Sequence, residues 1–447
     1  MRILLISFIA ILSLIASIQA VTWSRVYGTT YNDYAHVIKQ TPDGRYIVIG
    51  HSEVGVLHNI WLLKLDEFGD TTWSISIDSS FSTSTLQLDI EVDFDSGYVL
   101  TCNKVLYDVY PRLYLRIIKL DYNGTVVWSE LYNLYESDNN YPYDLDITAD
   151  SNYIVVGNAK YNNDEAFIMK VNRNSDSVWA TTAPESYFLS VCETRENGYI
   201  TSVVDVYPYP PQVLYKFDSF GNYLLWKSYD ELGYCIDNLN DSIFILATES
   251  HIFKIDENLD TILSINVGAL DLESCIDSGF VSVYEVNSDA YLSKYTNSGD
   301  SLWTVQYGSY GDDFFCCVNR TTDGGYICCG ATNSWGAGGC DYYIVKTDSL
   351  GYAMGVEEEP TQQYPEFPDI FIEYLSSGQI KISFIQSHAG NLNFSVYDLS
   401  GRIIDHPLEG FQEEGEHTIT LTDYRPGVYF YRMLSGEEEW RGKFQVY

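Results

Sequence analysis

The sequence has few basic residues, few methionines and no long apolar run after its N-terminal segment. Only 25 Lys and Arg stand against 62 Asp and Glu, so the formal net charge is −37 over 447 residues. A nucleic-acid binder neutralises phosphates with clustered Lys and Arg. No such cluster occurs, so the composition excludes nucleic acid as a general partner and disfavours anionic lipid. Later segments fall short of the roughly 18 apolar residues that a membrane-spanning helix needs.

The residues that are abundant indicate a folded β protein. Apolar residues make up 46% of the chain and charged residues 19%, which is too hydrophobic a composition for a disordered protein. The chain contains 39 Tyr, 20 Phe and 9 Trp but only 4 Met. Because aromatic side chains favour strands over helices, the composition predicts an all-β fold.

The N-terminus has the features of a secretory signal peptide. Arg2 gives a short basic start, an apolar run extends from Ile3 to Ile15, and Ala20 is a small residue at the cleavage position. Ile18 is larger than the residue usually found there, so an uncleaved anchor is the alternative. We expect removal of residues 1–20 and export of the mature chain.

Cysteine and histidine give no clear sign of a metal centre. Nine cysteines is an odd number in a chain too large to require disulfide staples. Three lie in apolar segments and suit core packing, and four lie on two successive predicted strands, where a cross-strand disulfide is the alternative to packing. These sets are Cys192, Cys235 and Cys275, and Cys316, Cys317, Cys328 and Cys329. Without a CxxC motif, and with seven histidines scattered along the sequence, we expect no metal site and no cofactor.

A repeat of seven units organises most of the chain. Each unit has a strand that ends in Lys, then a turn, then in most copies a strand that carries Trp, as in Lys64 to Trp73. Successive repeat lysines lie 38 to 55 residues apart, which is the length of a propeller blade. They are Lys64, Lys119, Lys170, Lys216, Lys254, Lys294 and Lys346. A second landmark, a turn such as Asp43-Gly44 before a β-branched strand, gives each unit four short strands.

The N-terminal strand completes this scheme. Residues 21–28 read as a Trp-bearing outer strand with no unit before it, whereas the seventh unit ends at Gly351 without such a strand. Pairing the two leaves no open sheet edge. We therefore predict a seven-bladed β-propeller over residues 21–355, closed by the N-terminal strand.

The seven units resemble the repeats of secreted bacterial β-propeller proteins. The seventh unit matches best, and Trp303, Tyr307-Gly308, Gly311-Asp312-Asp313, Thr322 to Tyr326 and Asn333 to Gly338 carry the likeness. The resemblance concerns architecture and implies little about activity.

The C-terminal part is expected to be a separate β domain. An acidic linker with several prolines covers residues 356–368, and alternating strands over residues 369–447 predict a small immunoglobulin-like β-sandwich.

This C-terminal domain resembles the type A sorting domain of the type IX secretion system. The motif residues are Tyr397, Asp398, Gly401 and Arg402 in the first motif, Gly427 and Tyr429 in the second, and Lys443 in the last strand. The resemblance implies the outer-membrane secretion machinery as a partner, and secretion or outer-surface display by a Gram-negative-type bacterium. An ordinary immunoglobulin-like accessory module is the alternative.

The repeated Lys and Asp residues are interpreted as structural, because a catalytic site is needed once and a blade turn in every blade. Neither the sialidase Asp-box spacing nor quinoprotein cofactor ligands are found. We therefore expect a non-catalytic protein. The alternative is a glycan-active or quinoprotein-like enzyme, which a cluster of blade-specific His, Arg, Asp or Glu at the central channel with shifted pKa values would favour.

Aromatic residues in the loops between strands are the candidate binding residues. They are Tyr110, Tyr141, Tyr143, Tyr207, Tyr209 and Trp335. Exposed aromatic side chains stack on sugars or anchor a protein partner, although the abundance of Tyr is itself an explanation. Asp312 and Asp313, with Asp33, lead into innermost strands and are either Ca²⁺ ligands or turn caps. The sequence thus predicts an exported propeller that binds a glycan or a protein.

Overall fold

The computed structural model describes residues 20–54, 57–81, 88–107, 111–134, 139–160, 164–184, 186–205, 212–229, 231–240, 242–358, 371–374, 380–386, 389–398, 402–413, 415–422, 424–425, 427–435 and 438–446. The chain forms two compact units, residues 1–362 and 363–447. The predicted signal peptide, except Ala20, lies outside the described residues. Within the described part, no helix has the length and apolar character required to cross a membrane.

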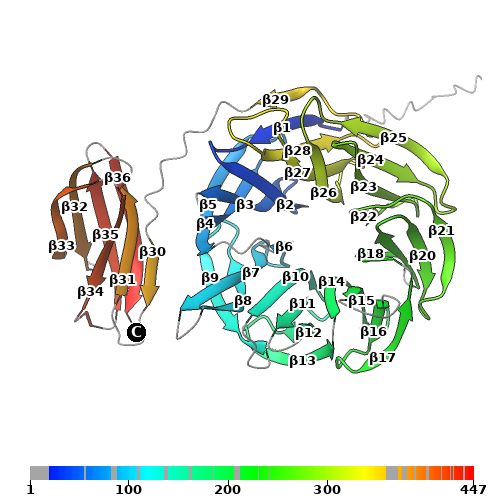
Figure 1. Ribbon diagram of the computed structural model, residues 1–447, viewed down its shortest axis with the longest axis horizontal. Helices are drawn as coiled ribbons and strands as arrows, with labels where there is room; N and C mark the ends of the chain where they lie inside the picture. The colour runs from blue at the N-terminus through cyan, green and yellow to red at the C-terminus, as the bar shows by residue number, and fades with distance from the viewer. Residues whose placement is uncertain are drawn as a thin grey trace, which may run out of the picture. The chain divides into compact units, whose positions relative to one another are not determined.

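The first unit is built from groups of antiparallel strands that follow one another along the chain. The groups are β2 (Asn32–Gln40), β3 (Tyr46–Val54), β4 (Leu57–Leu65) and β5 (Thr71–Phe81); β6 (Asp89–Val92), β7 (Tyr98–Tyr107), β8 (Pro111–Leu120) and β9 (Val126–Tyr132); β10 (Asn139–Ile147), β11 (Tyr153–Lys160), β12 (Asp164–Val171) and β13 (Ser177–Pro184); β14 (Ser186–Glu193), β15 (Tyr199–Asp205), β16 (Gln212–Phe217) and β17 (Tyr223–Ser228); β18 (Gly233–Asn240), β19 (Ile243–Thr248), β20 (Ile252–Asp256) and β21 (Thr261–Ile265); β22 (Asp271–Ser274), β23 (Phe280–Val286), β24 (Asp289–Tyr295) and β25 (Ser301–Tyr307); and β26 (Asp313–Arg320), β27 (Tyr326–Thr332) and β28 (Asp341–Thr347). Figure 1 shows the groups around a ring, with the first strand of each group innermost, which is a propeller-like arrangement.

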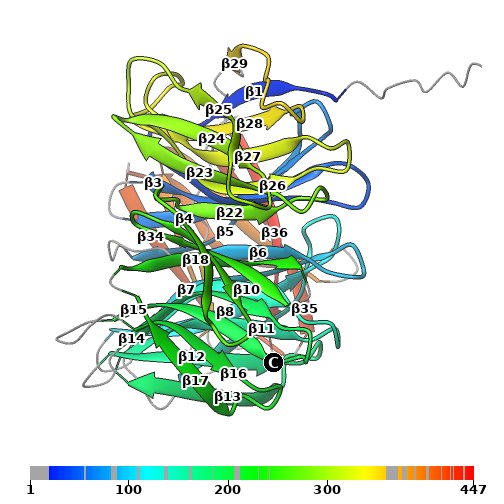
Figure 2. The same cartoon turned by 90° about the vertical axis from the view of Figure 1, so that its right-hand side faces the viewer.

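The N-terminal strand β1 (Trp23–Tyr27) completes the last group, as predicted. It pairs antiparallel with β28, and Trp23 lies opposite Lys346. The strand β29 (Val356–Glu358) then pairs parallel with β1 on its other side, and the three strands lie together in both views (Figure 1 and Figure 2). Residues 356–358, which were predicted to begin the linker, instead form a strand that extends this sheet. The chain folds back along β1 after Gly351, so a linker can begin only after residue 358. The rest of that linker lies outside the described residues.

Apolar side chains fill the space between neighbouring groups. One core cluster combines Ile47, Ile49 and Leu62 of the first group with Leu100 and Ile118 of the next. Strands such as β27 and β28 are buried along their whole length, as expected for sheets that pack on both faces. All nine cysteines have free thiols, and six of them are buried, so the structure shows no cross-strand disulfide among Cys316, Cys317, Cys328 and Cys329.

The tryptophan of an outer strand packs on a tyrosine of the following group. The ring centroids are 6.2 Å apart for Trp73 and Tyr98, 6.2 Å for Trp128 and Tyr153, 5.8 Å for Trp179 and Tyr199, 5.9 Å for Trp303 and Tyr326, and 5.8 Å for Trp23 and Tyr46. The last pair joins β1 to the first group. The repeated Trp and Tyr residues therefore hold successive groups together.

Five of the seven repeated lysines are buried, which fits their structural interpretation. Lys64, Lys119, Lys170, Lys294 and Lys346 are all at most 5% exposed. Lys170 Nζ lies 2.8 Å from Asp150 Oδ2 of its own group and 3.0 Å from the Tyr199 hydroxyl of the next. Lys294 makes the same contacts with Asp277 and Tyr326, at 3.0 and 3.1 Å. Each of these two ammonium groups thus joins its own turn to the neighbouring group.

The second unit has two sheets around one core. One sheet consists of β30 (Phe371–Tyr374), β31 (Ile380–Gln386) and β34 (Gly415–Leu421), and the other of β33 (Ile403–Gln412), β32 (Gly390–Tyr397), β35 (Gly427–Ser435) and β36 (Glu438–Val446). Buried side chains from both sheets, including Ile382, Phe394, Ile419 and Met433, form a single cluster.

Candidate functional site

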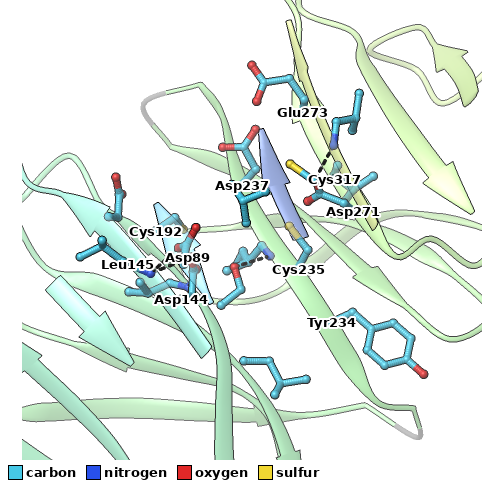
Figure 3. Close-up of a pocket in the computed structure, with 18 of the residues that line it drawn as sticks. Asp89, Asp144, Leu145, Cys192, Tyr234, Cys235, Asp237, Asp271, Glu273 and Cys317 are labelled. Carbon is cyan, nitrogen blue, oxygen red and sulfur yellow. Dashed lines mark hydrogen bonds between the residues drawn. The ribbon is translucent and has the colours of Figure 1, made fainter. Parts of the chain in front are cut away.

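The innermost strands of the first unit line a cavity of about 320 Å³. Figure 3 shows part of its lining, in which carboxylates and cysteines from several strands surround a common space. The lining residues come from β2, β6, β10, β14, β18, β22 and β26. The cavity is therefore the central channel of the propeller-like unit.

Two positions of each innermost strand face the cavity, and the pairing with the second strand of each group defines them. The first layer is Val37, Asp89, Asp144, Ser190, Cys235, Asp271 and Cys317. The second layer is Lys39, Glu91, Asp146, Cys192, Asp237, Glu273 and Asn319. Seven of these side chains are acids, and the described lining contains one lysine and no arginine.

β-Bulges bring additional side chains into the channel. The ladder between β2 and β3 shifts between Ala35 and Val37, so His36 is the extra residue on β2. Equivalent shifts occur in β10, β14, β18 and β26, where the extra residues are Tyr143, Leu189, Tyr234 and Cys316. All five line the cavity. An extra residue interrupts the alternation of a strand and redirects a side chain.

The first layer joins neighbouring innermost strands. Next to a bulge, a backbone N–H loses its partner in the ladder, and a buried N–H needs another acceptor. The Leu145 N–H donates to Asp89 Oδ2 at 2.7 Å, the Val191 N–H to Asp144 Oδ2 at 2.7 Å, and the Val318 N–H to Asp271 Oδ2 at 2.8 Å. Each acceptor belongs to the preceding group. These carboxylates therefore have a structural task at the cavity wall.

The second layer holds most of the unusual electrostatics. Burial raises the pKa of Asp146 to about 8, and the charges of Glu91 and Asp144 add to the shift. Burial also raises the pKa of Glu273 to about 8, with a further contribution from Asp237. Lys39 Nζ lies 2.5 Å from Glu91 Oε1. Burial alone would lower the pKa of Lys39, but Glu91 and Asp89 outweigh it and raise the pKa. The channel has more acid than its lysine neutralises.

Because the pKa of Asp146 is raised, its ionisation destabilises the fold. The folded protein binds this proton more tightly than the unfolded chain between pH 4 and 8, so stability falls as pH rises through that window. We expect Asp146→Asn to raise the free energy of unfolding at pH 8.5 by about 1–3 kcal/mol, less than the full shift implies because the side chain is only partly buried. At pH 4, where Asp146 is protonated, the variant and the wild type should be equally stable.

Thermal unfolding at the two pH values measures this effect. The control is Glu196→Gln, which removes the same charge from an exposed turn. Equal stability of Asp146→Asn and wild type at both pH values would contradict the raised pKa.

The structure distributes the predicted aromatic residues over different environments. Tyr143 lines the channel and makes an edge contact with Tyr187 at 6.3 Å. Tyr141 is half-buried on β10. Trp335 is also half-buried and packs on Tyr343 at 5.6 Å, against the core. The other three, Tyr110, Tyr207 and Tyr209, lie outside the described residues.

The predicted loop aspartates take part in turns. Asp313 is fully buried and accepts hydrogen bonds from the Ser309 N–H at 2.8 Å, the Ser334 hydroxyl at 2.7 Å and the Thr332 hydroxyl. Asp33 likewise accepts the Thr29 N–H at 2.6 Å and the Thr29 hydroxyl at 2.9 Å. The exposed Asp312 is near Asn333. These contacts are those of turn caps, and binding by these residues stays a prediction.

Three of the histidines are not scattered in space, contrary to the expectation from the sequence. His36 Nε2 lies 2.8 Å from His51 Nδ1, and the rings of His51 and His58 stack with centroids 5.1 Å apart. Burial lowers the pKa of His51 to about 3 and of His36 to about 4, so both rings are neutral at physiological pH. Antiparallel pairing of β2, β3 and β4 brings them together.

The channel acids were not among the residues predicted as a site, although their pattern is visible in the sequence. An acid, an apolar residue and a second acid recur in three innermost strands. The motifs are Asp89-Ile90-Glu91, Asp144-Leu145-Asp146 and Asp271-Leu272-Glu273. Alternate residues of a strand share one face, so this recurrence at equivalent repeat positions predicts acids around the axis.

Two residues of the first sorting motif, Asp398 and Arg402, are bonded to each other. The Asp398 N–H donates to the Arg402 carbonyl at 2.9 Å, and an Arg402 guanidinium nitrogen lies 3.1 Å from Asp398 Oδ2. Tyr397 ends β32, and Gly401 lies outside the described residues. These contacts therefore join the end of β32 to the residue that precedes β33.

The second motif lies on β35. Gly427 begins the strand, opposite Val446. The Tyr429 hydroxyl donates to the Arg425 carbonyl at 2.8 Å. Lys443 on β36 pairs with Phe430 through the backbone ladder. The two motifs thus mark the two neighbouring strands β32 and β35 of one sheet.

Comparisons with solved structures find β-rich chains of low identity. The Neurospora crassa Pan2 WD40 domain has 9% identity and a TM-score of 0.46, covering 73% of this chain and 100% of its own. BBS1N in complex with ARL6DN has 11% identity and a TM-score of 0.47, covering 74% and 99%. A protein of unknown function from Bacteroides caccae has 10% identity and a TM-score of 0.39, covering 59% and 94%. Among curated proteins, none matches this sequence.

The tail gives a family match. Residues 376–447 match the family model described as the secretion system C-terminal sorting domain. This match confirms the sorting domain that motifs such as Tyr397-Asp398 and Gly427 predicted. Such a domain indicates export from a bacterium to the cell surface or beyond. The chain thus joins a propeller-like repeat unit to a tail that matches the secretion system sorting domain, and this tail indicates export.

Proposed function

We propose that this protein is an exported, non-catalytic seven-bladed propeller, followed by an immunoglobulin-like sorting sandwich, and that its central channel binds a cationic group of a glycan or protein partner. The count of seven treats β6–β9 and β10–β13 as separate blades. One backbone pairing, Asn139 with Leu113, is all that joins them among the described residues. The count also assigns β1 to the blade of β26–β28.

The observation that carries the binding proposal is the excess of acid in the channel. Seven Asp and Glu side chains line it against a single lysine among the described lining residues. Lys39 is paired with Glu91, and Arg320 Nε contacts Glu273 at 3.3 Å. The other five acids form no salt bridge among the described residues, and the charge of Lys39 is shared among several of them. A positively charged ligand would relieve their mutual repulsion and lower their raised pKa values.

The size and aromatic content of the channel suit a small cationic group. A volume of about 320 Å³ is at the lower end of small-molecule sites. Tyr143 and Tyr234, the extra residues of two bulges, are among the lining residues, and tyrosine rings attract cations and stack on sugars. A lysine side chain of a protein partner and an amino sugar both meet these requirements.

A carboxyl-based glycan hydrolase is the second candidate, and one observation favours it. Asp89 and Asp144 lie within hydrogen-bonding reach. Burial, the charge of Asp144 and that hydrogen bond together raise the pKa of Asp89 well above its ordinary value. Carboxyl pairs that differ in protonation carry out acid and base steps in glycosidases. The structural hydrogen bonds of Asp89 and Asp144 to backbone amides favour the binding role.

Binding assays with matched charged and neutral probes test the proposal. The charged probes are tetralysine and a chitosan oligosaccharide, and their neutral counterparts are Nε-acetylated tetralysine and a chitin oligosaccharide of equal length. We expect the protein to bind only the charged probes. The double variant Asp146→Asn, Glu273→Gln should weaken binding at least ~10-fold, since hydrogen bonds to charged groups contribute about 1.5–3 kcal/mol each. Glu196→Gln should bind like wild type. Tetralysine should bind more tightly at pH 8.5 than at pH 6, as Asp146 and Glu273 ionise.

The outcomes separate the two candidates. Equal affinity for charged and neutral probes would contradict the role of the acids. Repeated turnover of an oligosaccharide by wild type, lost in Asp89→Asn, would overturn the non-catalytic proposal and support the hydrolase.

A further inference from the structure

Potential metal ligands come together on the first blade, away from the channel acids. The strands β2, β3 and β4 are neighbours, and their register places Tyr34 opposite His51 and Glu53 opposite His58. His51, Glu53 and His58 each offer a ligand atom, and the three atoms lie within 4.8 Å of one another. The three residues lie within eight consecutive positions of the sequence, but they come from the two paired strands β3 and β4.

These donors match the preference of zinc. Zn²⁺ binds imidazole nitrogen and carboxylate oxygen at about 2.0–2.2 Å, which places tetrahedral ligands roughly 3.3 Å apart. Small side-chain rotations would close the observed separation. Two histidines and one glutamate leave a fourth position open, as in zinc sites that hold a water molecule or a substrate atom.

Surrounding residues already orient two of the ligands. His36 Nε2 lies 2.8 Å from His51 Nδ1, which leaves His51 Nε2 for a metal. Asn32 Nδ2 donates to Glu53 Oε2 at 2.8 Å, which leaves the other carboxylate oxygen. Tyr34 stacks on His51 with ring centroids 5.2 Å apart. Partners of this kind fix ligand orientation in metal sites.

The third ligand has an unused nitrogen. His58 Nδ1 is buried and has no hydrogen-bond partner among the described residues. A buried polar atom without a partner is costly, and a metal ion in the cluster would satisfy it. The ring of His58 stacks on His51 at 5.1 Å, so both imidazoles are close to one point.

We propose that His51, Glu53 and His58 form a Zn²⁺ site on the first blade, with His36 and Asn32 as positioning residues. None of the three ligands lines the channel, although the positioning residue His36 does. The site would tie the hairpin of β3 and β4 to β2 through His36. The open coordination position makes the site able to take a further oxygen or nitrogen ligand.

Metal titration of the full mature chain, stripped with a chelator, tests this proposal. We expect one equivalent of Zn²⁺ by calorimetry and an upward shift of the thermal midpoint. His58→Gln and Glu53→Gln should each weaken Zn²⁺ binding at least ~100-fold, because each removes one of three ligands. The matched control is His251→Gln. His251 also contacts a glutamate, Glu231, but belongs to no three-ligand group among the described residues, so its replacement should leave binding unchanged.

Substitution with Co²⁺ distinguishes the ligands from the free cysteines. Co²⁺ bound to nitrogen and oxygen gives visible ligand-field bands without intense thiolate charge-transfer absorption, and the bands should vanish in His58→Gln. Thiolate absorption, no Zn²⁺ binding by wild type, or unchanged affinity of the correctly folded His58→Gln and Glu53→Gln variants would each overturn the proposal.

Discussion

Replacement of Asp323 by alanine is expected to lower the free energy of unfolding of the propeller-like unit by about 3–5 kcal/mol, because it leaves a buried ammonium without its counter-ion. Lys346 Nζ lies 2.8 Å from Asp323 Oδ2, and the lysine side chain is 1% exposed. Burial lowers the pKa of Lys346. Burial opposes the ionisation of Asp323, but the hydrogen bond from Lys346 outweighs it and lowers the pKa. Calorimetry should show a fall in the thermal midpoint of roughly 4–7 °C.

Two further variants make this experiment specific. Asp43→Ala changes the corresponding turn of the first group, where Asp43 is 56% exposed and its Oδ1 lies 4.0 Å from Lys64 Nζ. Its cost should be under about 1 kcal/mol, as for an exposed ion pair. The double variant Asp323→Ala, Lys346→Met should recover part of the stability, since methionine needs no counter-ion. Both lysines are buried, so equal costs for the two aspartates would show that the shorter contact and greater burial of Asp323 do not matter.

Deletion of residues 369–447 is expected to abolish delivery to the cell surface in the native host. The matched family segment, residues 376–447, lies wholly inside the deletion, and the propeller-like residues belong to a separate compact unit. The truncated chain should therefore fold and accumulate in the periplasm. Protease treatment of intact cells, followed by fractionation and immunoblotting, measures the change.

A fusion serves as the complementary control. Residues 369–447 attached to a periplasmic reporter should carry the reporter to the surface. Circular dichroism of the truncated chain must show intact β structure, so that loss of export is not loss of folding. Surface display of the truncated protein at the level of wild type would refute the sorting role.

Much of the architecture follows from residues that recur in every unit. The recurrence of Lys170 and Lys294 at equivalent positions predicted that these lysines hold a turn in place. In the structure, each contacts an aspartate of its own turn and a tyrosine of the next group. The unmatched Trp23 strand predicted the pairing with β28, because an outer strand without a group must complete another one. Recurrence is informative here because every group packs against its neighbours through the same strand positions.

The site was less predictable because it depends on what differs between units. Asp89 and Asp271 share a cavity only after innermost strands from all the groups converge on one axis. The bulges are a second reason. A bulge at His36 places an extra residue in β2, and strict alternation in the sequence assigns such a side chain to the wrong face. The histidine cluster needed the register of three strands, which spacing along the chain does not reveal.

The pairing of β1 with β28 and β29 also sets the timing of folding. β1 is synthesised before every other strand of its unit, whereas its partners are synthesised after all the others. A partly emerged chain therefore has no means of completing its last sheet, and unpaired strands at such a stage favour aggregation. The sorting domain follows β29 in sequence. The unit consequently becomes able to close only after β29 has been made, shortly before the matched sorting segment of residues 376–447 follows in the chain.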